Sequence, residues 1–284
     1  MTTQYQRSER QARRLAYRRR RATTAITVAT ASTVVVAVAA AFAFTHAPGW
    51  PRVRETFFSG ADFRASFPDV LAGFWLNVEI FMIAEVCVLV IGLTVAVTRS
   101  VRTPALFPIR ALAIAYVDVF RGVPLLLVVF LVGFGVPALN LTGVTSDPVV
   151  LGTVALILSY SAYVAEVYRA GIESIHPSQR AAARALGLRH HQAMRYVVLP
   201  QAVRRVVPPL LNDFVSLQKD SALVAVLGPL EAVRQAQIYA SGKFNFTSYM
   251  VAALLFIALT IPLARLTDRI ALRTARRQGP GGMA

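Results

Sequence analysis

Long apolar stretches alternate with short clusters of arginine along most of the chain. A helix that crosses a bilayer needs about 20 mostly apolar residues, and five stretches have roughly this length or more with few charges. They are residues 22–45, 70–98, 111–138, 148–165 and 244–264. A sixth stretch, residues 206–230, is interrupted by Pro208-Pro209, Asp213, Lys219 and Asp220, and we count it as an irregular span. The pattern therefore predicts an all-α integral membrane protein.

The arginine clusters predict how these spans are oriented. With six spans, 23 arginines fall on one side of the membrane, within residues 1–21, 99–110, 169–205 and 265–277. The opposite side carries only five basic residues, which are Arg52, Arg54, Arg64, Arg234 and Lys243. Cytoplasmic segments carry the excess of Lys and Arg in membrane proteins. We therefore expect a multi-pass protein with both termini in the cytoplasm.

The first apolar stretch has two interpretations. Its basic leader and the small residues around Thr45-His46-Ala47 resemble a signal peptide. However, the apolar core of a signal peptide is usually about 7–15 residues long, and this one is longer. We favour a retained helix; cleavage would leave five spans and place the new N-terminus outside.

The composition supports a membrane protein over other classes. The chain is 56% hydrophobic and only 15% charged, which is less charge than soluble domains carry. Its formal net charge of +16 could indicate a nucleic-acid partner, but the arginines lie between apolar runs, so we expect none. The single cysteine, Cys87, excludes an intramolecular disulfide.

The longest loop on the arginine-rich side, from Arg169 to about Arg205, has the features of a helical hairpin. Pro177-Ser178 is a helix start with Ser178 as the cap, and Gly187 suits the left-handed residue that ends a helix. A second helix is expected over residues 189–199, ending at Pro200. Such a hairpin fits a groove on another protein, or it lies on anionic lipid, and physical reasoning alone favours neither.

Several motifs in a fixed order resemble one family of proteins. Ala181-Ala182-Ala183-x-x-x-Gly187 and Val197-x-Leu199-Pro200 resemble the cytoplasmic EAA loop of permease subunits of binding-protein-dependent ABC importers. Further similar segments begin at Tyr116, Ala165, Leu199 and Lys219: they read YVDVFRGVPLL, AEVYRAGI, LPQA and KDSAL, and the last two are typical of the polar amino acid branch. Together the motifs cover about residues 68–272.

The resemblance implies a fold, a function and a set of partners. It implies a five-helix permease core over residues 68–272, with a coupling loop at about 172–200 that docks on ABC ATPase subunits. The implied coupling residues are Ser178, Ala182, Ala183, Gly187, Leu199 and Pro200. It further implies an amino acid substrate, an external solute-binding protein, a second permease (a copy or a relative) and a location in the bacterial plasma membrane.

The chain departs from the family pattern in two places. Ala181 stands where the loop motif has Glu, so any contact of that carboxylate is missing. Residues 22–45 add a transmembrane helix to the core and are interpreted as a membrane anchor. A basic arm (residues 1–21) precedes this helix, and a cytoplasmic tail (residues 273–284) ends the chain.

The sequence contains no ATPase motif of its own. The one Gly-Lys pair, Gly242-Lys243, lacks the glycine five residues earlier and the following hydroxyl that a phosphate-binding loop requires. No catalytic set stands out, and the adjacent His190-His191 point to different helix faces, so we expect no metal and no cofactor. We therefore predict a transport subunit and not an enzyme, with a secondary transporter or channel for small polar solutes as the alternative.

Ionisable and amide side chains inside spans are candidates for the solute path, because an ionisable group costs roughly 3 kcal/mol at mid-bilayer unless it faces protein or water. The candidates are Asn77, Glu79, Glu85, Asn212, Lys219 and Asp220. Structural pairing is the alternative for each, including mutual neutralisation of Lys219 and Asp220. Asp118 and Arg121 are three residues apart and are expected to form a local ion pair, and Glu166 is expected to pair with Arg169 or with a neighbouring helix.

Overall fold

A computed structural model describes residues 9–101 and 103–276, which contain helices and no strand. The chain divides into two compact units, residues 1–55 and 56–284. The helices in order are α1 (Glu9–Thr45), α2 (Trp50–Phe57), α3 (Gly60–Ser100), η1 (Pro104–Leu106), α4 (Phe107–Gly122), α5 (Leu125–Ala138), α6 (Pro148–Glu173), α7 (Pro177–Ala185), α8 (His190–Ala193), η2 (Met194–Val198), α9 (Leu199–Asp220), η3 (Ser221–Leu227), α10 (Ala232–Lys243) and α11 (Thr247–Arg276).

The first unit consists mainly of α1, which contains the predicted extra span. Its stretch Thr23–Thr45 is apolar and long enough to cross a bilayer, and its side chains are exposed. The helix begins at Glu9, so the basic residues from there to Arg21 are helical and continuous with the span. The rest of the predicted basic arm, residues 1–8, lies outside the described residues.

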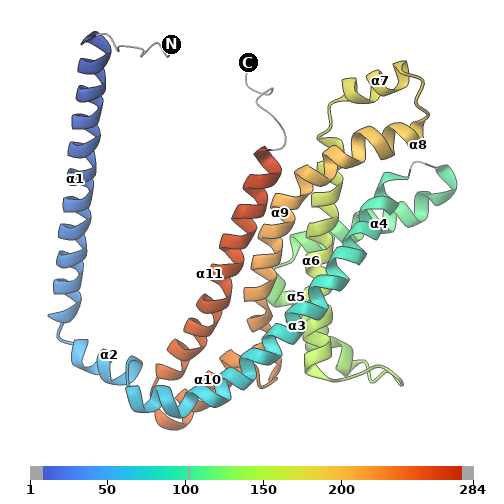
Figure 1. The fold of residues 1–284 in the computed structure, drawn as a ribbon. Coiled ribbons are helices and arrows are strands. Elements are labelled where there is room, and N and C mark those ends of the chain that lie inside the picture. Colours follow the sequence, from blue (N-terminus) through green and yellow to red (C-terminus); the bar gives the residue numbers. More distant parts are fainter. Residues whose placement is uncertain (1–8, 102, 277–284) are drawn as a thin grey trace. The chain divides into compact units, whose positions relative to one another are not determined.

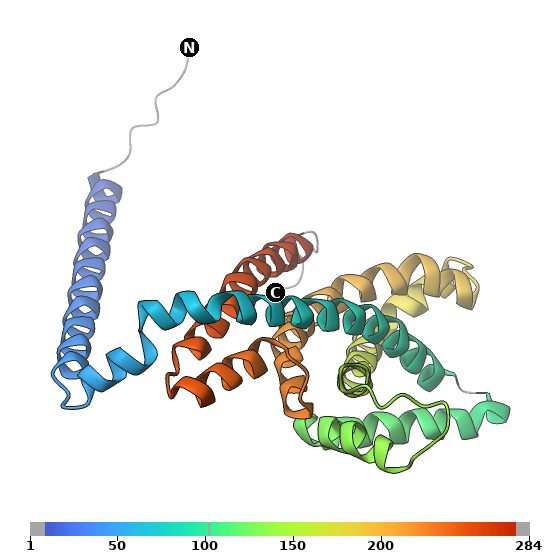
Figure 2. The ribbon, with the colours of Figure 1, turned by 90° about the horizontal axis from the view of Figure 1, so that it is seen from below.

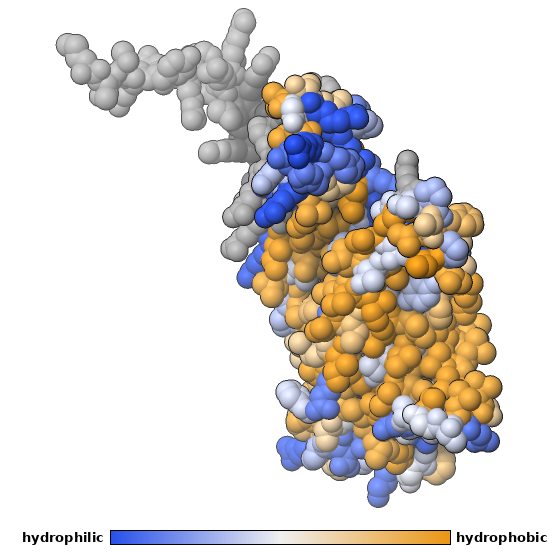
Figure 3. Space-filling model, turned by 90° about the vertical axis from the view of Figure 1, so that its right-hand side faces the viewer, coloured by the Kyte–Doolittle hydropathy of each residue, from blue (hydrophilic) through white to orange (hydrophobic). Residues whose placement is uncertain are grey.

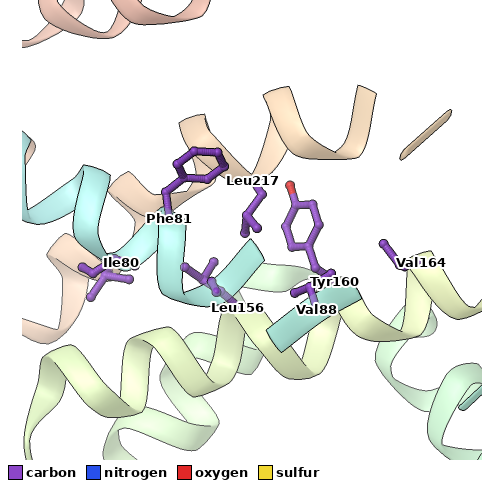
Figure 4. Close-up of a cluster of buried hydrophobic side chains, with 9 residues drawn as sticks. Ile80, Phe81, Val88, Leu156, Tyr160, Val164 and Leu217 are labelled. Atoms are coloured by element: carbon purple, nitrogen blue, oxygen red, sulfur yellow. The ribbon is translucent and has the colours of Figure 1, made fainter. Parts of the chain in front are cut away.

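The second unit is built around α6, which packs against α3, α4, α5 and α9 (Figures 1 and 2). Small residues allow the closest approach: a Cβ on Gly92 of α3 would lie 2.6 Å from Val164 Cγ1 of α6. Such contacts are typical of helices that associate inside membranes. The main core cluster joins Phe81, Leu156 and Leu217, from α3, α6 and α9 (Figure 4).

The predicted span over residues 111–138 is not one helix. It is divided into α4 and α5, which meet at an angle of 109° around Val123-Pro124. Pro124 has no backbone N–H, and it disfavours a helical conformation for the residue before it. Val123 is accordingly extended, with φ −95° and ψ 130°, and the chain turns there.

Two breaks predicted from prolines, one at the end of the hairpin and one in the sixth stretch, are wrong. Pro200 does not end a helix, because it lies in the first turn of α9, where the missing N–H costs nothing. Pro208-Pro209 lie inside α9, which continues to Asp220. The break comes later, in η3, which ends at Gly228 with φ +102°. Prolines inside membrane helices are tolerated where neighbouring helices cover the freed carbonyls.

Four described helices are long and apolar enough to cross a membrane, or five if α4 and α5 count as one bent span. The helix α9 is not among them, so its role as an irregular sixth span stays a prediction. Figure 3 shows apolar surface across the middle of the molecule and hydrophilic surface toward its two ends, as expected for a protein that spans a bilayer.

Candidate functional site

The hairpin formed by α7 and α8 is the first candidate site, and its first helix is capped at both ends. Pro177 begins α7 as predicted, but the cap is His176, whose Nδ1 accepts a hydrogen bond from the backbone N–H of Ser178 at 3.2 Å. Ser178 is therefore the second residue of the helix and not its cap. The ring of His176 also lies 2.7 Å from the hydroxyl of Ser178.

Gly187 ends the first helix of the hairpin in the left-handed conformation, with φ +80°. The N–H of Gly187 donates to the carbonyl of Arg184 at 2.9 Å, and the N–H of Leu188 donates to that of Ala183 at 3.1 Å. This pair of bonds is a Schellman motif, in which glycine avoids the Cβ clash that other residues meet. The predicted conformation of Gly187 is confirmed.

The two faces of α7 differ in exposure. Ser178, Ala182 and Gly187 are exposed, whereas Ala183 is 3% exposed and faces the body of the protein. Leu186 follows the helix with 82% of its surface exposed. One strip of the exposed surface at α7 (Ser178, Ala181, Ala182, Ala185 and Leu186), hereafter the outer face, is mostly small and apolar apart from its first hydroxyl, and exposed Gln179 and Arg184 flank it. Ala183 supports the hairpin from within.

The hairpin is fastened to the ends of α6 and α9. Ile175, Val198 and Ala202 form a buried cluster between these elements. Arg180 of α7 donates to the carbonyl of Ile172 at 3.1 Å, and Arg205 of α9 donates to the carbonyl of Ser174. These contacts resist movement of the hairpin relative to the two helices.

The second helix of the hairpin continues into α9, a helix of the core. It begins at His190, with the Gln192 side chain accepting from the N–H of Arg189 at 2.9 Å, and passes through the π-helical η2 directly into α9. Leu199 and Pro200 are exposed in the first turn of α9. The second helix therefore does not end at Pro200 as predicted. A force on the hairpin would act directly on a helix of the core.

Glu166 of α6 joins three arginines near the hairpin. Its carboxylate pairs with Arg169 one turn later and with Arg99 of α3 at 2.9 Å, so the predicted pairing is confirmed. Arg121 of α4 lies 3.9 Å from the same carboxylate. The predicted Asp118–Arg121 ion pair is wrong, because no such pair occurs among the described residues. Arg121 lies beside Glu166 instead, and Glu166 joins α3, α4 and α6 near the ends of these three helices.

A group of acidic and tyrosine side chains in the membrane core is the second candidate site. Glu85 of α3 and Asp213 of α9 are partly buried and close enough to repel each other. Within the described residues, no Lys or Arg forms an ion pair with either, and Asp213 Oδ2 is buried without a hydrogen-bond partner. Unpaired carboxylates at this depth are costly and favour a cation beside them. We call Glu85 and Asp213 the acidic pair.

Tyr160 and Asp220 lie near the acidic pair. The hydroxyl of Tyr160 on α6 donates to Asp220 Oδ2 at 2.7 Å, and Figure 4 shows its ring among the core side chains with the hydroxyl directed toward α9. Tyr160 also interacts electrostatically with Asp213. Asp220 is thus bound to a tyrosine, and it does not neutralise Lys219 as the alternative required, since the described residues contain no such ion pair.

The other candidates form no contact with the acidic pair in the described part of the chain. Glu79 and Asn212 are exposed on α3 and α9. Lys219 is also exposed and borders a cavity of about 390 Å³ that α11 lines with apolar side chains. None of the three is brought to Glu85 by a hydrogen bond or ion pair in the described part of the chain.

Asn77 has a structural contact at the other end of the core. It is 1% exposed, and its Oδ1 accepts from the backbone N–H of Ala232 at 3.1 Å, in the first turn of α10. Beside it, Glu231 caps α10 by accepting from the N–H of Arg234 at 2.6 Å. Burial raises the pKa of the Glu231 carboxyl above its usual value. The predicted role of Asn77 in the solute path stays a prediction.

Sequence reasoning did not select Asp213 or Tyr160 as site residues. Asp213 had a usable signal, because it is a carboxylate inside an apolar stretch. Tyr160 had none, since a tyrosine among Leu, Ser and Ala in a span is ordinary, and only the packing of α6 against α9 brings it to Asp220.

The fold and the hairpin define an integral membrane transport subunit, and comparison with known proteins agrees. The family described as "Binding-protein-dependent transport system inner membrane component" matches residues 89–278, so the chain belongs to this family. Such a subunit is not an enzyme; ATP is hydrolysed by a separate subunit.

Individual proteins are similar over most of the chain. The probable glutamine ABC transporter permease protein GlnM of Bacillus subtilis (strain 168) is 38% identical over 70% of this chain and 90% of its own length. The arginine transport system permease protein ArtQ of the same organism is 32% identical over 71% and 92%. A solved amino acid ABC transporter, crystallised with histidines, superposes with a TM-score of 0.67 and 33% identity over 72% of this chain and 94% of that one.

Proposed function

We propose that this chain is the membrane-spanning permease subunit of an ATP-driven importer of polar amino acids. The family match over residues 89–278, together with an exposed hairpin continuous with α9, carries this proposal. The similar permeases named for glutamine and arginine support the substrate class.

The partners follow from the kind of transporter. A permease of this family works with ATPase subunits and a solute-binding protein. The outer face docks on an ATPase subunit through Ser178, Ala182 and Leu186, while Gly187, Ala183, Leu199 and Pro200 shape the hairpin. A groove that receives a helix recognises its shape and small residues, which the outer face offers in the absence of the motif carboxylate at Ala181.

A second permease, a copy or a relative, completes the transporter. One five-helix core is too small to enclose a path that opens alternately to the two sides of the membrane. The excess of arginine on the hairpin side supports a cytoplasmic location for the hairpin and for both termini, in a bacterial plasma membrane.

The acidic pair supports an interaction with the positively charged group of the solute. An ammonium or guanidinium between Glu85 and Asp213 would relieve their repulsion and give the buried Oδ2 of Asp213 a donor. Tyr160 of α6 holds Asp220, which lies on α9 as Asp213 does. Asn77, Glu79, Asn212 and Lys219 remain candidates for other parts of the path.

The geometry supports a mechanism of alternating access. ATP binding would close the two ATPase subunits and draw the docked hairpins together. Because the hairpin is fastened to α6 and α9, these helices would move with it and open the core toward the binding protein. The acidic pair spans α3 and α9, so this motion would change its spacing and its affinity for a cation.

Uptake into vesicles that contain the permease, its ATPase and its binding protein tests the proposal. We expect ATP-dependent uptake of one or more polar amino acids from a labelled panel. Uptake that is independent of ATP and follows an ion gradient would instead identify a secondary transporter.

Replacing Lys219 by Met tests its place in the path. If Lys219 borders the solute, uptake falls at unchanged expression because the substitution removes a charge and keeps the length of the side chain. Unchanged uptake would exclude Lys219 from the path, and Arg64→Met on the exposed side of α3 serves as the charge-matched control.

A further inference from the structure

A basic cavity lies between the hairpin and the ends of the core helices. It has a volume of about 650 Å³, and its charged lining consists of Arg99, Arg110, Arg169, Arg180 and Glu173, with His190 beside them. These residues come from α3, α4, α6, α7 and α8. The cavity is distinct from the acidic pair and from the outer face.

Two of the four arginines of the cavity, Arg110 and Arg180, have no carboxylate partner among the described residues. Arg99 and Arg169 are paired with Glu166 and Glu173. Arg110 has no ion pair or hydrogen bond among the described residues, and its Nε is buried without a partner, as is the Nε of Arg180. Four guanidinium groups thus line a space that only one carboxylate, Glu173, also lines among the described residues. An anion in the cavity would satisfy the remaining donors.

The position of the cavity favours a membrane lipid as the source of this anion. Arg99 and Ser100 end one apolar span, and Ile172 and Glu173 end another, so the cavity lies where the membrane meets water. Leu106 and Phe107 lie one turn before Arg110 and are 41% and 66% exposed, as side chains facing acyl chains would be. A headgroup can enter the cavity while its chains stay on this apolar surface.

The hairpin presents opposite sides to the cavity and to its proposed protein partner. Arg180 points inward to the carbonyl of Ile172, and it lines the cavity. Ala181, Ala182 and Leu186 point away from it. An ATPase subunit docked on the outer face would therefore leave the cavity available to lipid.

We propose that this cavity binds the phosphate of an anionic phospholipid headgroup. Arg110 and Arg180 donate to the phosphate, and Leu106 and Phe107 contact the acyl chains. Basic pockets between membrane helices on the cytoplasmic side bind such headgroups. The bound lipid joins α4 to the hairpin and stiffens the connection through which the hairpin moves the core. Only the choice of the cytoplasmic leaflet rests on the orientation proposed above.

Native mass spectrometry of the purified full-length protein tests the site. The protein is mixed with phosphatidylglycerol and phosphatidylcholine of identical acyl chains, and the retained lipids are counted. We expect preferential retention of phosphatidylglycerol. Arg110→Gln should weaken this retention about tenfold, because it removes a charge-assisted contact, while Arg110→Lys should keep most of it.

Arg195→Gln is the matched control, because Arg195 is an exposed arginine on the same hairpin that does not line the cavity. Equal retention of the two lipids would overturn the proposal, as would equal losses in Arg110→Gln and Arg195→Gln when lipid-free thermal unfolding is unchanged. Displacement of the lipid by equimolar inorganic phosphate would assign the site to a free anion. Displacement by the purified ATPase subunit would assign it to protein. Either displacement would overturn the lipid as the occupant.

Discussion

The hairpin and the membrane core of the second unit are stabilised in different ways. In α6, 61% of the apolar span is buried, and its glycines Gly152 and Gly171 allow η3 and α9 to approach closely. The hairpin is held by one small cluster, one arginine–carbonyl bond to α6 and its caps, and its outer face is exposed. Substitutions on the outer face should therefore impair function in a protein that still folds, whereas those in the core should first impair folding.

Gly187→Arg should have the largest effect on transport. Any residue with a Cβ strains the backbone at φ +80°, and the arginine side chain would stand beside the outer face, where it obstructs docking of an ATPase subunit. We expect ATP-dependent uptake to fall more than about tenfold, a loss of at least about 1.4 kcal/mol of coupling, at normal membrane levels. Labelled uptake into vesicles measures it.

Gly143→Arg is the control for backbone strain, because Gly143 has φ +84° in the loop between α5 and α6 and open space around it. Retained uptake in this variant, together with loss in Gly187→Arg, would assign the loss to the hairpin. Equal losses of uptake in both variants would show that backbone strain, and not the position in the hairpin, causes the loss.

Asp213→Asn should change which solutes are carried. The amide keeps the shape but removes the charge that would face a solute ammonium or guanidinium, a contact worth about 1.5–3 kcal/mol. We expect uptake of arginine to fall about tenfold or more, and more than that of glutamine, in competition assays. Asn140→Asp adds a carboxylate in the exposed loop after α5, away from the candidate path, and should leave this ratio unchanged. An equal loss for both amino acids in Asp213→Asn would assign the contact to the α-ammonium that both carry, and unchanged uptake of arginine would contradict a charge-specific role.

Gly73→Ala should destabilise the core. Its Cβ would lie 2.6 Å from the backbone carbonyl carbon of Glu231 and 2.8 Å from the N of Ala232, and backbone atoms cannot rotate away. Overpacking of this kind costs about 1–3 kcal/mol, so the midpoint of thermal unfolding should fall. Gly135→Ala in α5, where a Cβ meets nothing within 4 Å, should be neutral or slightly stabilising. Equal midpoints in the two variants would refute the close approach of α3 and α10.

Glu231→Gln should have the smallest effect, and one that depends on pH. Burial raises the folded-state pKa of Glu231. The protonated side chain therefore contributes its full stabilisation of the folded state below the unfolded pKa of about 4.3, and this stabilisation is lost as pH rises through the folded-state pKa. Thermal unfolding should therefore show the variant gaining stability over the wild type as pH rises. Glu79→Gln, at an exposed carboxyl of α3, is the matched control. A constant difference for Glu231→Gln at all pH values would exclude titration of this carboxyl.

Periodicity and turn chemistry predicted most of the helices, because apolar runs and caps are local signals. Gly187 and Pro177 mark the ends of α7 as expected. The effects of the prolines were predicted wrongly in two opposite ways. Pro124 bends a predicted single span by 109°, while Pro208-Pro209 leave α9 intact. A proline removes a donor locally, but surrounding helices decide whether the chain turns, and the sequence does not display those neighbours.

The candidate site was predictable only in part. The hairpin is contiguous in sequence, so its motif and its caps could be recognised together. The acidic pair joins residues on α3 and α9 that are more than 100 positions apart, and Asp220 finds Tyr160 through packing of α9 on α6. Charges inside a span identify candidates, but their partners depend on helix packing. For this reason Arg121 lies beside Glu166, and Asp118 has no part in that network.

Photo-crosslinking from two equally exposed positions tests most directly whether the hairpin is the coupling element. Leu186 on the outer face and Phe244 after α10, at the opposite end of the second unit, are 82% and 83% exposed (Figure 1). A benzophenone amino acid at each position, in the assembled transporter, should crosslink to the ATPase subunit from Leu186 and not from Phe244. Crosslinks from Phe244 alone, or from neither position in a transporter active in ATP-dependent uptake, would contradict the account.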